Sequence, residues 1–142
     1  MPKASKASTE GQDHGPVLDH SAEIDGYTVN FVTFRQDIDA TSLLKGLPGD
    51  QCPCPHWGYV LKGRLTYKVG DGEEVFETGD AFYLSPGHIP VGNEPGTEMM
   101  QFSPAEDLRK VSETMQKNMQ AMQGGRGQKP WPRRPRAGRR AS

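Results

Sequence analysis

The sequence has few apolar residues and no long apolar run. Of its 142 residues, 33% are hydrophobic, and the mean hydropathy is -0.75. No stretch is long enough to span a bilayer, and polar residues follow Met1 where a signal peptide would need an apolar segment. We therefore expect a cytoplasmic protein without membrane contact. In that reducing compartment, the two cysteines are expected to be thiols and not a structural disulfide.

Several signatures of common activities are also missing. The chain contains no pattern of a nucleophile triad, of a phosphate-binding glycine loop or of paired catalytic carboxylates. It also lacks a helix-turn-helix pattern, which argues against a transcription factor. The sequence therefore indicates a fold and a candidate site more clearly than it indicates a substrate.

Large apolar side chains are nearly absent from both ends, and this divides the chain. We expect a disordered leader over 1–20, one β domain over 21–103, a helix over 104–123 and a disordered basic tail over 124–142. The tail has seven Lys or Arg and no acid, whereas the other residues have ten basic and eighteen acidic side chains. Such an acidic body argues against nucleic-acid binding, apart from weak contact by the tail.

Short strands separated by Gly and Pro turns dominate the middle of the chain. Leu65, Tyr67 and Val69 alternate with polar residues, as in a half-buried strand, and 70–72 is a hairpin turn. Further strands are expected at 26–34, 57–61, 73–77, 81–84 and 97–102, with one helical turn within 37–47. This all-β pattern, followed by a single amphipathic helix, predicts a small antiparallel barrel or jelly roll.

The helix over 104–123 has a start signal and one apolar stripe. Ser103 is expected to cap it, with Pro104 at the first helical position and Glu106 completing a capping box. The stripe that follows consists of Leu108, Val111, Met115, Met119 and Met122. We expect this stripe to pack against the barrel or against a second subunit.

The candidate metal ligands are Cys52, Cys54, His56 and His88. The first three are two residues apart, so they share one face of an extended chain, which Pro53 and Pro55 favour. His88 follows a Pro-Gly turn, where it can project into a barrel mouth and supply the fourth ligand. Thiolate and imidazole together predict a divalent metal, with Zn²⁺ preferred and Fe or Mn as alternatives. The competing interpretation is that buried thiols and a hydrogen-bonded histidine simply pack in the core.

Aromatic residues beside these candidates suggest a small-molecule site. Trp57, Tyr59, Phe82 and Tyr83 are the predicted ligand-binding residues at the barrel mouth. Alternation alone does not decide which of them face inward, because both faces of a strand can be buried in a barrel that dimerises.

Two segments resemble the motifs of small single-domain cupins, over roughly residues 27–102. They are Tyr59-Val-Leu-Lys-Gly63 and Gly79-Asp-Ala-Phe-Tyr-Leu-Ser-Pro-Gly87. The cupin motifs are G-x5-H-x-H-x3-E-x6-G and G-x5-P-x-G-x2-H-x3-N. The resemblance implies a cupin barrel and a homodimer that pairs through barrel faces.

The metal-binding positions of the cupin motifs are altered in this chain. When the first motif is anchored on Gly63, His56 takes the place of the glutamate, while Cys52 and Asp50 take the places of the two histidines. In the second motif, Pro90 replaces the metal-binding histidine. The pattern His-x-Gly-Tyr-Val-Leu with Pro-Gly-His also resembles a subgroup of uncharacterised small cupins, which implies a site on His56 and His88 with a nearby cysteine.

Three functional hypotheses follow from these patterns. The first is a metallo-cupin enzyme of the lyase, isomerase or hydrolase type, with a small-molecule substrate in the barrel. The second is a metal-free cupin module that binds a small metabolite without catalysis. The third is an interaction protein that works through its amphipathic helix and basic tail.

Overall fold

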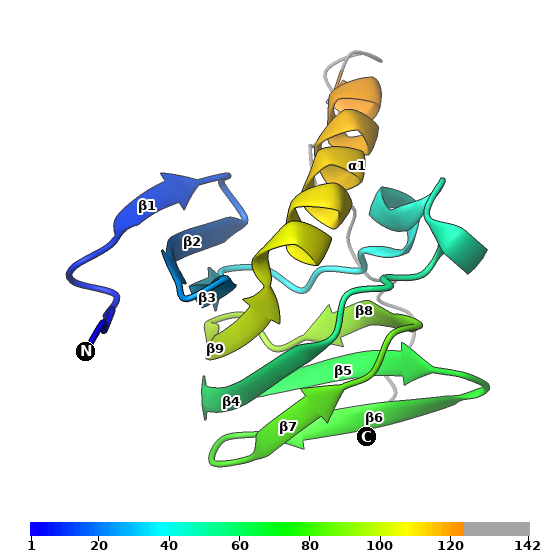
Figure 1. Ribbon diagram of the computed structural model, residues 1–142. Coiled ribbons are helices and arrows are strands. Elements are labelled where there is room, and N and C mark those ends of the chain that lie inside the picture. The colour runs from blue at the N-terminus through cyan, green and yellow to red at the C-terminus, as the bar shows by residue number, and fades with distance from the viewer. Residues whose placement is uncertain (124–142) are drawn as a thin grey trace.

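The computed structural model describes residues 1–123, and these residues form two antiparallel sheets and one long helix (Figure 1). The six-stranded sheet has the order β1-β2-β3-β9-β4-β7, and the three-stranded sheet has the order β6-β5-β8. The strands are β1 (Glu10–Asp13), β2 (Val17–Ile24), β3 (Tyr27–Phe34), β4 (His56–Lys62), β5 (Arg64–Val69), β6 (Gly72–Glu77), β7 (Ala81–Leu84), β8 (His88–Asn93) and β9 (Thr97–Pro104). The helical elements are η1 (Thr41–Leu44), η2 (Pro48–Asp50) and α1 (Ala105–Gln123).

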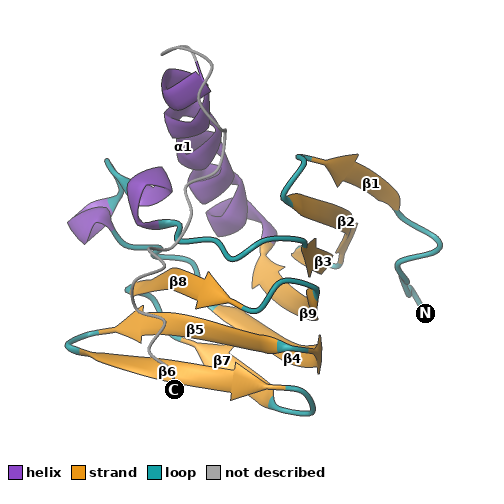
Figure 2. Ribbon diagram, turned by 180° about the vertical axis from the view of Figure 1, so that it is seen from behind, coloured by secondary structure: helices purple, strands orange, loops and turns teal. Residues whose placement is uncertain are grey.

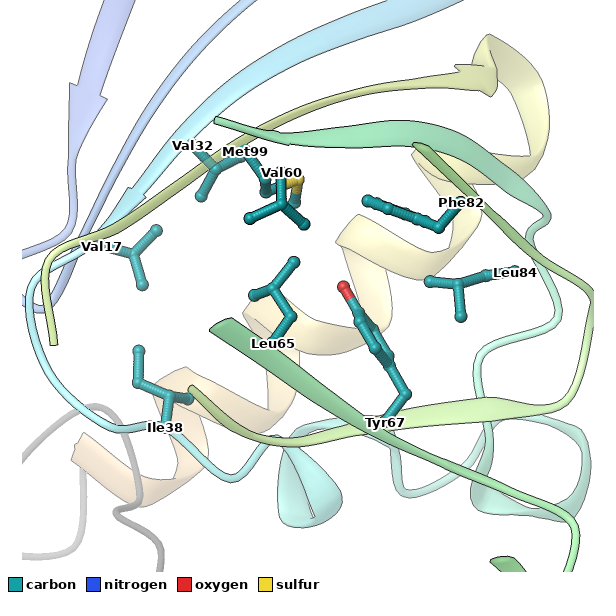
Figure 3. Packing of buried hydrophobic residues seen from close by; sticks show 9 residues of the cluster. All are labelled: Val17, Val32, Ile38, Val60, Leu65, Tyr67, Phe82, Leu84 and Met99. Carbon is teal, nitrogen blue, oxygen red and sulfur yellow. The ribbon is translucent and has the colours of Figure 1, made fainter. Parts of the chain in front are cut away.

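The main core lies between the two sheets. Val32, Val60 and Met99 reach inward from the six-stranded sheet, while Leu65 and Tyr67 come from β5 in the other sheet (Figure 3). Alternation predicts that Leu65 and Tyr67 are buried and Lys68 exposed, and this is confirmed, whereas Thr66 is buried as well. We call the side of the six-stranded sheet that faces this core its inner face, and the opposite side its outer face.

Close packing between strands requires glycine at two positions. Gly63, in the turn between β4 and β5, has a φ of 92°, and a Cβ at this position would collide with Thr97. Gly58, within β4, has extended backbone, but a Cβ there would collide with the Phe82 ring and would lie 2.7 Å from the Met100 carbonyl oxygen. Glycine in β4 therefore lets Phe82 pack onto the inner face.

Helix α1 lies beside η1 at one end of the sheets, as Figures 1 and 2 both show. Its residues Leu108, Val111 and Met115 pack in a second cluster with Leu44 and Ile89, and this confirms the predicted apolar stripe. Asn118 fixes the helix further, because its side-chain nitrogen donates to the carbonyl oxygens of Leu43 and Lys45 at 2.7 and 3.0 Å. No helix within residues 1–123 has the length and hydrophobicity that a membrane crossing requires.

Three strands were not anticipated from the sequence. β1 and the first half of β2 lie within 1–20, so a disordered leader is the wrong description of residues 10–20. β1 is polar and exposed, and β2 pairs along its whole length with β3, which supplies the backbone hydrogen bonds that composition does not reveal. β8 contains Pro90 and Gly92, which hide its strand pattern.

The predicted basic tail, 124–142, lies outside the described residues.

Candidate metal centre

Cys52, His56 and His88 come together in the interior. All three are buried, and one potential ligand atom from each lies within 4.8 Å of the others. His56 is the first residue of β4 and His88 is the first residue of β8, so the cluster joins the two sheets. Cys52 is fixed against β8 by two backbone hydrogen bonds: its N–H donates to the His88 carbonyl oxygen at 2.9 Å, and its carbonyl oxygen accepts from Gly87 at 2.8 Å.

Hydrogen bonds fix the orientation of both imidazoles. His88 Nδ1 lies 2.8 Å from the Ser85 carbonyl oxygen. A carbonyl oxygen only accepts, so Nδ1 carries the proton and the lone pair of Nε2 is available to a metal. His56 Nδ1 lies 2.7 Å from Ser103 Oγ, and His56 Nε2 lies 3.7 Å from Cys52 Sγ. Such a second partner on the opposite ring nitrogen is typical of metal-binding histidines.

The spacing of the Cys52 sulfur and the His56 ring nitrogen fits a tetrahedral metal. Bonds of about 2.1 Å to nitrogen and about 2.3 Å to sulfur place the two ligand atoms about 3.6 Å apart in a tetrahedral site. The distance between Cys52 Sγ and His56 Nε2 is 3.7 Å. Three protein ligands would leave a fourth position for water or substrate, which is the arrangement of catalytic zinc sites.

Burial keeps the metal-free cluster neutral near pH 7. It lowers the pKa of His56 to about 3, with a smaller contribution from His88, and it raises the pKa of Cys52 to about 11. The pKa of His88 is also lowered by burial. The imidazole of His56 is thus ready to coordinate without losing a proton, whereas the Cys52 thiol must lose one on metal binding.

Cys54 lies outside this cluster, although it was predicted as a ligand. Its Sγ contacts the Pro55 carbonyl oxygen at 3.5 Å, and burial raises its pKa to about 12. The prediction assumed an extended chain with regular alternation from 52 to 56, but β4 begins only at His56.

Asp50 and Pro90, which stand at the positions that the cupin motifs give to metal ligands, are not in the cluster either. The Asp50 carboxylate is instead exposed and accepts from the Gly46 N–H at 3.0 Å.

Three of the four predicted ligand-binding aromatics lie on the outer face. Trp57, Tyr59 and Tyr83 are 43, 42 and 52% exposed, and none of them lines the interior cavity. Phe82 is buried in the core between the sheets (Figure 3). Because His56 points inward, alternation along β4 directs Trp57 and Tyr59 outward.

The cluster opens onto a cavity of about 300 Å³ between the sheets and helix α1. Cys52, His56 and His88 form part of its lining. Much of the remaining wall is apolar, with contributions from Val17, Val32, Phe34, Ile38, Leu65, Met99, Leu108, Val111, Met115 and Met119. Helix α1 therefore covers one side of the cavity as well as packing against η1.

Several polar residues of the site were not predicted from the sequence. Ser103 was assigned as a helix cap, but it belongs to β9 and its hydroxyl contacts His56. Asp19, Asn30 and Gln101 also line the cavity. Alternation within 26–34 places Asn30 on the same face as Val32 and could have identified it, whereas Asp19 was hidden in the supposed leader.

Comparison with known proteins supports the fold. No protein-family model matches the chain, and no curated protein matches it. A protein of unknown function from Rhizobium leguminosarum is 16% identical and has a TM-score of 0.54, with 72% of this chain and 94% of that chain covered. KdgF from Halomonas sp. is 20% identical, with a TM-score of 0.51 and coverage of 70% and 92%. The polyketide cyclase RemF from Streptomyces resistomycificus is 11% identical, with a TM-score of 0.51 and coverage of 73% and 79%.

At these identities the likeness shows the fold alone. The two antiparallel sheets and the neighbouring structures confirm the small antiparallel jelly-roll fold predicted from the sequence, completed by a C-terminal helix.

Proposed function

We propose that this chain binds a divalent metal ion, with Zn²⁺ preferred over Fe or Mn, through Cys52, His56 and His88. The observation that carries the proposal is the convergence of one sulfur and two ring nitrogens within 4.8 Å, buried beside a cavity. A thiolate with two imidazoles suits a borderline ion such as Zn²⁺. Cys54, whose thiol lies outside the cluster, is not part of the proposed ligand set.

We further propose that the cavity holds a small organic substrate and that the protein is an enzyme of the lyase, isomerase or hydrolase type. When bound, the metal would supply Lewis-acid polarisation of a substrate oxygen or an activated water. The chain itself contributes orientation, because Ser85 and Ser103 hold the two imidazoles. The apolar wall from both sheets and α1 would exclude bulk water and bind the substrate's carbon frame.

The metal content of full-length, untagged protein tests this proposal. We expect about one equivalent of metal per chain after purification in metal-supplemented medium, measured by elemental analysis. Cys52→Ser and His56→Ala should lose it, whereas Cys54→Ser is the matched control and should retain it. Equal metal content in the Cys52 and Cys54 variants, or none in the wild type, would refute the proposed site.

The neutral state of the metal-free cluster favours a second candidate function, a metabolite-binding module without catalysis. In that state the Cys52 thiol can donate to His56 Nε2, and His56 Nδ1–H can donate to Ser103, so the cluster is satisfied without an ion. Thermal stabilisation by a metabolite that persists after EDTA treatment would support this alternative. Loss of all such stabilisation on chelation would exclude it.

We also propose that the protein is a cytoplasmic homodimer, as expected from the sequence. The outer aromatic patch, consisting of Tyr27, Trp57, Tyr59, Tyr83 and Phe102, is the apolar area on the outer face that a second copy would cover. Its rings already contact one another, with centroids of Trp57 and Tyr83 5.1 Å apart and those of Tyr27 and Trp57 6.3 Å apart.

A further inference from the structure

A polar group stands on the inner face beside the apolar wall of the cavity. It consists of Asp19 on β2, Asn30 on β3 and Gln101 on β9, and all three residues line the cavity. The group is contiguous across neighbouring strands. Asn30 is paired in register with Gln101, and its side-chain nitrogen donates to both Asp19 carboxylate oxygens at 3.0 and 3.3 Å.

Two amides in this group have unused hydrogen-bonding capacity. Asn30 is only 6% exposed, and its Oδ1 has no hydrogen-bond partner within residues 1–123. Gln101 is 9% exposed, and its side chain makes no hydrogen bond in the described part of the chain. Buried amide groups without partners are unfavourable, so a ligand that supplied those hydrogen bonds would be bound more tightly than one that did not.

No described Lys or Arg faces the charge of this group in the cavity, although His14 also lines the cavity and interacts with Asp19. Asp19 is the one acidic residue among the described residues that line the cavity, and no Lys or Arg occurs in that lining. Burial raises the pKa of Asp19, while the hydrogen bond from Asn30 and the nearby His14 and His20 oppose this shift. A half-buried carboxylate without a Lys or Arg beside it in the cavity can be paired by a cationic ligand with N–H donors.

We infer that Asp19, Asn30 and Gln101 form the recognition site for the ammonium group of an amine ligand, whose apolar body lies against the wall of the cavity. This inference rests on the proposed small-molecule binding by the cavity. The ammonium would pair with the Asp19 carboxylate and donate to the amide oxygens of Asn30 and Gln101. The specificity of the cavity is therefore for cationic amines over neutral or anionic molecules of the same size.

Three probes with the same six-carbon chain test this selectivity: hexylammonium, hexanol and hexanoate. Their binding to full-length protein is measured by calorimetry near neutral pH and at fixed ionic strength. We expect hexylammonium to bind at least ten-fold more tightly than hexanol. Asp19→Asn should abolish this preference, whereas Glu23→Gln, which removes an exposed charge from the same strand, should preserve it.

A second variant addresses the risk that Asp19→Asn disturbs folding. Gln101→Met removes the buried amide at similar size and should weaken hexylammonium binding several-fold while hexanol binding is retained. If hexanol or hexanoate binds but hexylammonium shows no preference, the ammonium site is refuted and the cavity function stands. If none of the three binds, both proposals fail. An equal loss of preference in Glu23→Gln would attribute it to general surface charge and would also refute the site.

Discussion

The two faces of the six-stranded sheet carry opposite kinds of side chain. The inner face has His56, Ser103 and Gln101 among apolar core residues, while the outer face has Trp57, Tyr83 and Phe102 as exposed aromatics. His56 and Trp57 are neighbours in sequence, as are Phe82 and Tyr83, yet each pair is divided between the two faces. The exposed aromatic rings are gathered on the outer face, whereas Tyr67 and Phe82 pack in the core. The buried polar groups that lack hydrogen-bond partners within the described residues lie inside.

Two features of this arrangement depart from what hydrophobicity alone would suggest: the polar side chains inside and the aromatic side chains outside. Buried polar side chains are unfavourable unless they are paired, and they are retained where they bind something or hold a binding group in place. Exposed aromatic patches, in turn, are typical of interaction surfaces. The inner face is therefore the candidate site for small molecules and metal, and the outer face is the candidate surface for a second copy.

The largest expected effect concerns the acid stability of the inner face. In EDTA-treated protein, His56 has a pKa of about 3 when folded and one near 6.5 when unfolded, so the unfolded state binds the extra proton between these values. We expect the free energy of unfolding to fall as the pH drops from 6.5 to 3, by on the order of 4 kcal/mol from this residue. Urea unfolding at several pH values measures the loss, and His56→Asn should show a flatter acid limb. Parallel curves for the two proteins would contradict the prediction.

The second largest effect should be the difference in stability loss between a buried leucine and an exposed one. Leu65 is 3% exposed in the core between the sheets, whereas Leu61, near the end of β4, is 46% exposed. We expect Leu65→Ala to lower the free energy of unfolding by about 3 kcal/mol and Leu61→Ala by less than about 1 kcal/mol. Denaturant titration at pH 7 compares them. If the two losses were equal, the division into inner and outer faces would be wrong.

Ser103 should show a smaller effect that acts through His56. Its hydroxyl holds His56 Nδ1 at 2.7 Å, so Ser103→Ala removes the group that orients the ring without removing a proposed ligand. We expect the metal affinity to fall by about ten-fold. Competition with a chromogenic chelator measures it, and Ser103→Thr, which keeps the hydroxyl, serves as the control. An unchanged affinity would mean that Ser103 has only a packing role.

Changes to the outer face should affect stability least. Trp57→Ser with Tyr83→Ser should leave metal binding intact and change the monomer's free energy of unfolding by about 1 kcal/mol or less, because both residues are roughly half exposed. The same pair should shift the protein from dimer to monomer in analytical ultracentrifugation. A dimer that persists would place the interface elsewhere, and a wild-type monomer would end the homodimer proposal.

Much of the fold could be predicted because its signals are local. The alternation of Leu65, Tyr67 and Val69, the hairpin glycines and the stripe beginning at Leu108 are each contained in a few residues. β1 and β2 were missed because their support comes from pairing with a neighbouring strand, β1 with β2 and β2 with β3, and a polar segment carries no local sign of such pairing. β8 was missed because Pro90 and Gly92 interrupt the expected pattern.

The candidate site was only partly predictable for a similar reason. Cys52, His56 and His88 were selected as residue types able to bind a metal, and the structure brings these three together. The separation of Cys54 from them depends on where β4 begins, and the inward orientation of His56 decided which aromatics face outward. Asp19 has no motif and lies in the supposed leader, whereas alternation with Met99 in the predicted strand over 97–102 could have placed Gln101 on the inner face.

The sequence by itself determined the jelly-roll architecture, the helix and the residues with metal-binding chemistry, because periodicity, turn residues and side-chain chemistry are properties of short stretches. Only the tertiary structure decided which donors converge, which faces they occupy and which polar groups share their cavity. The reason is that strand register and sheet packing place residues that are tens of positions apart within a few ångströms of each other, and no local spacing encodes that distance.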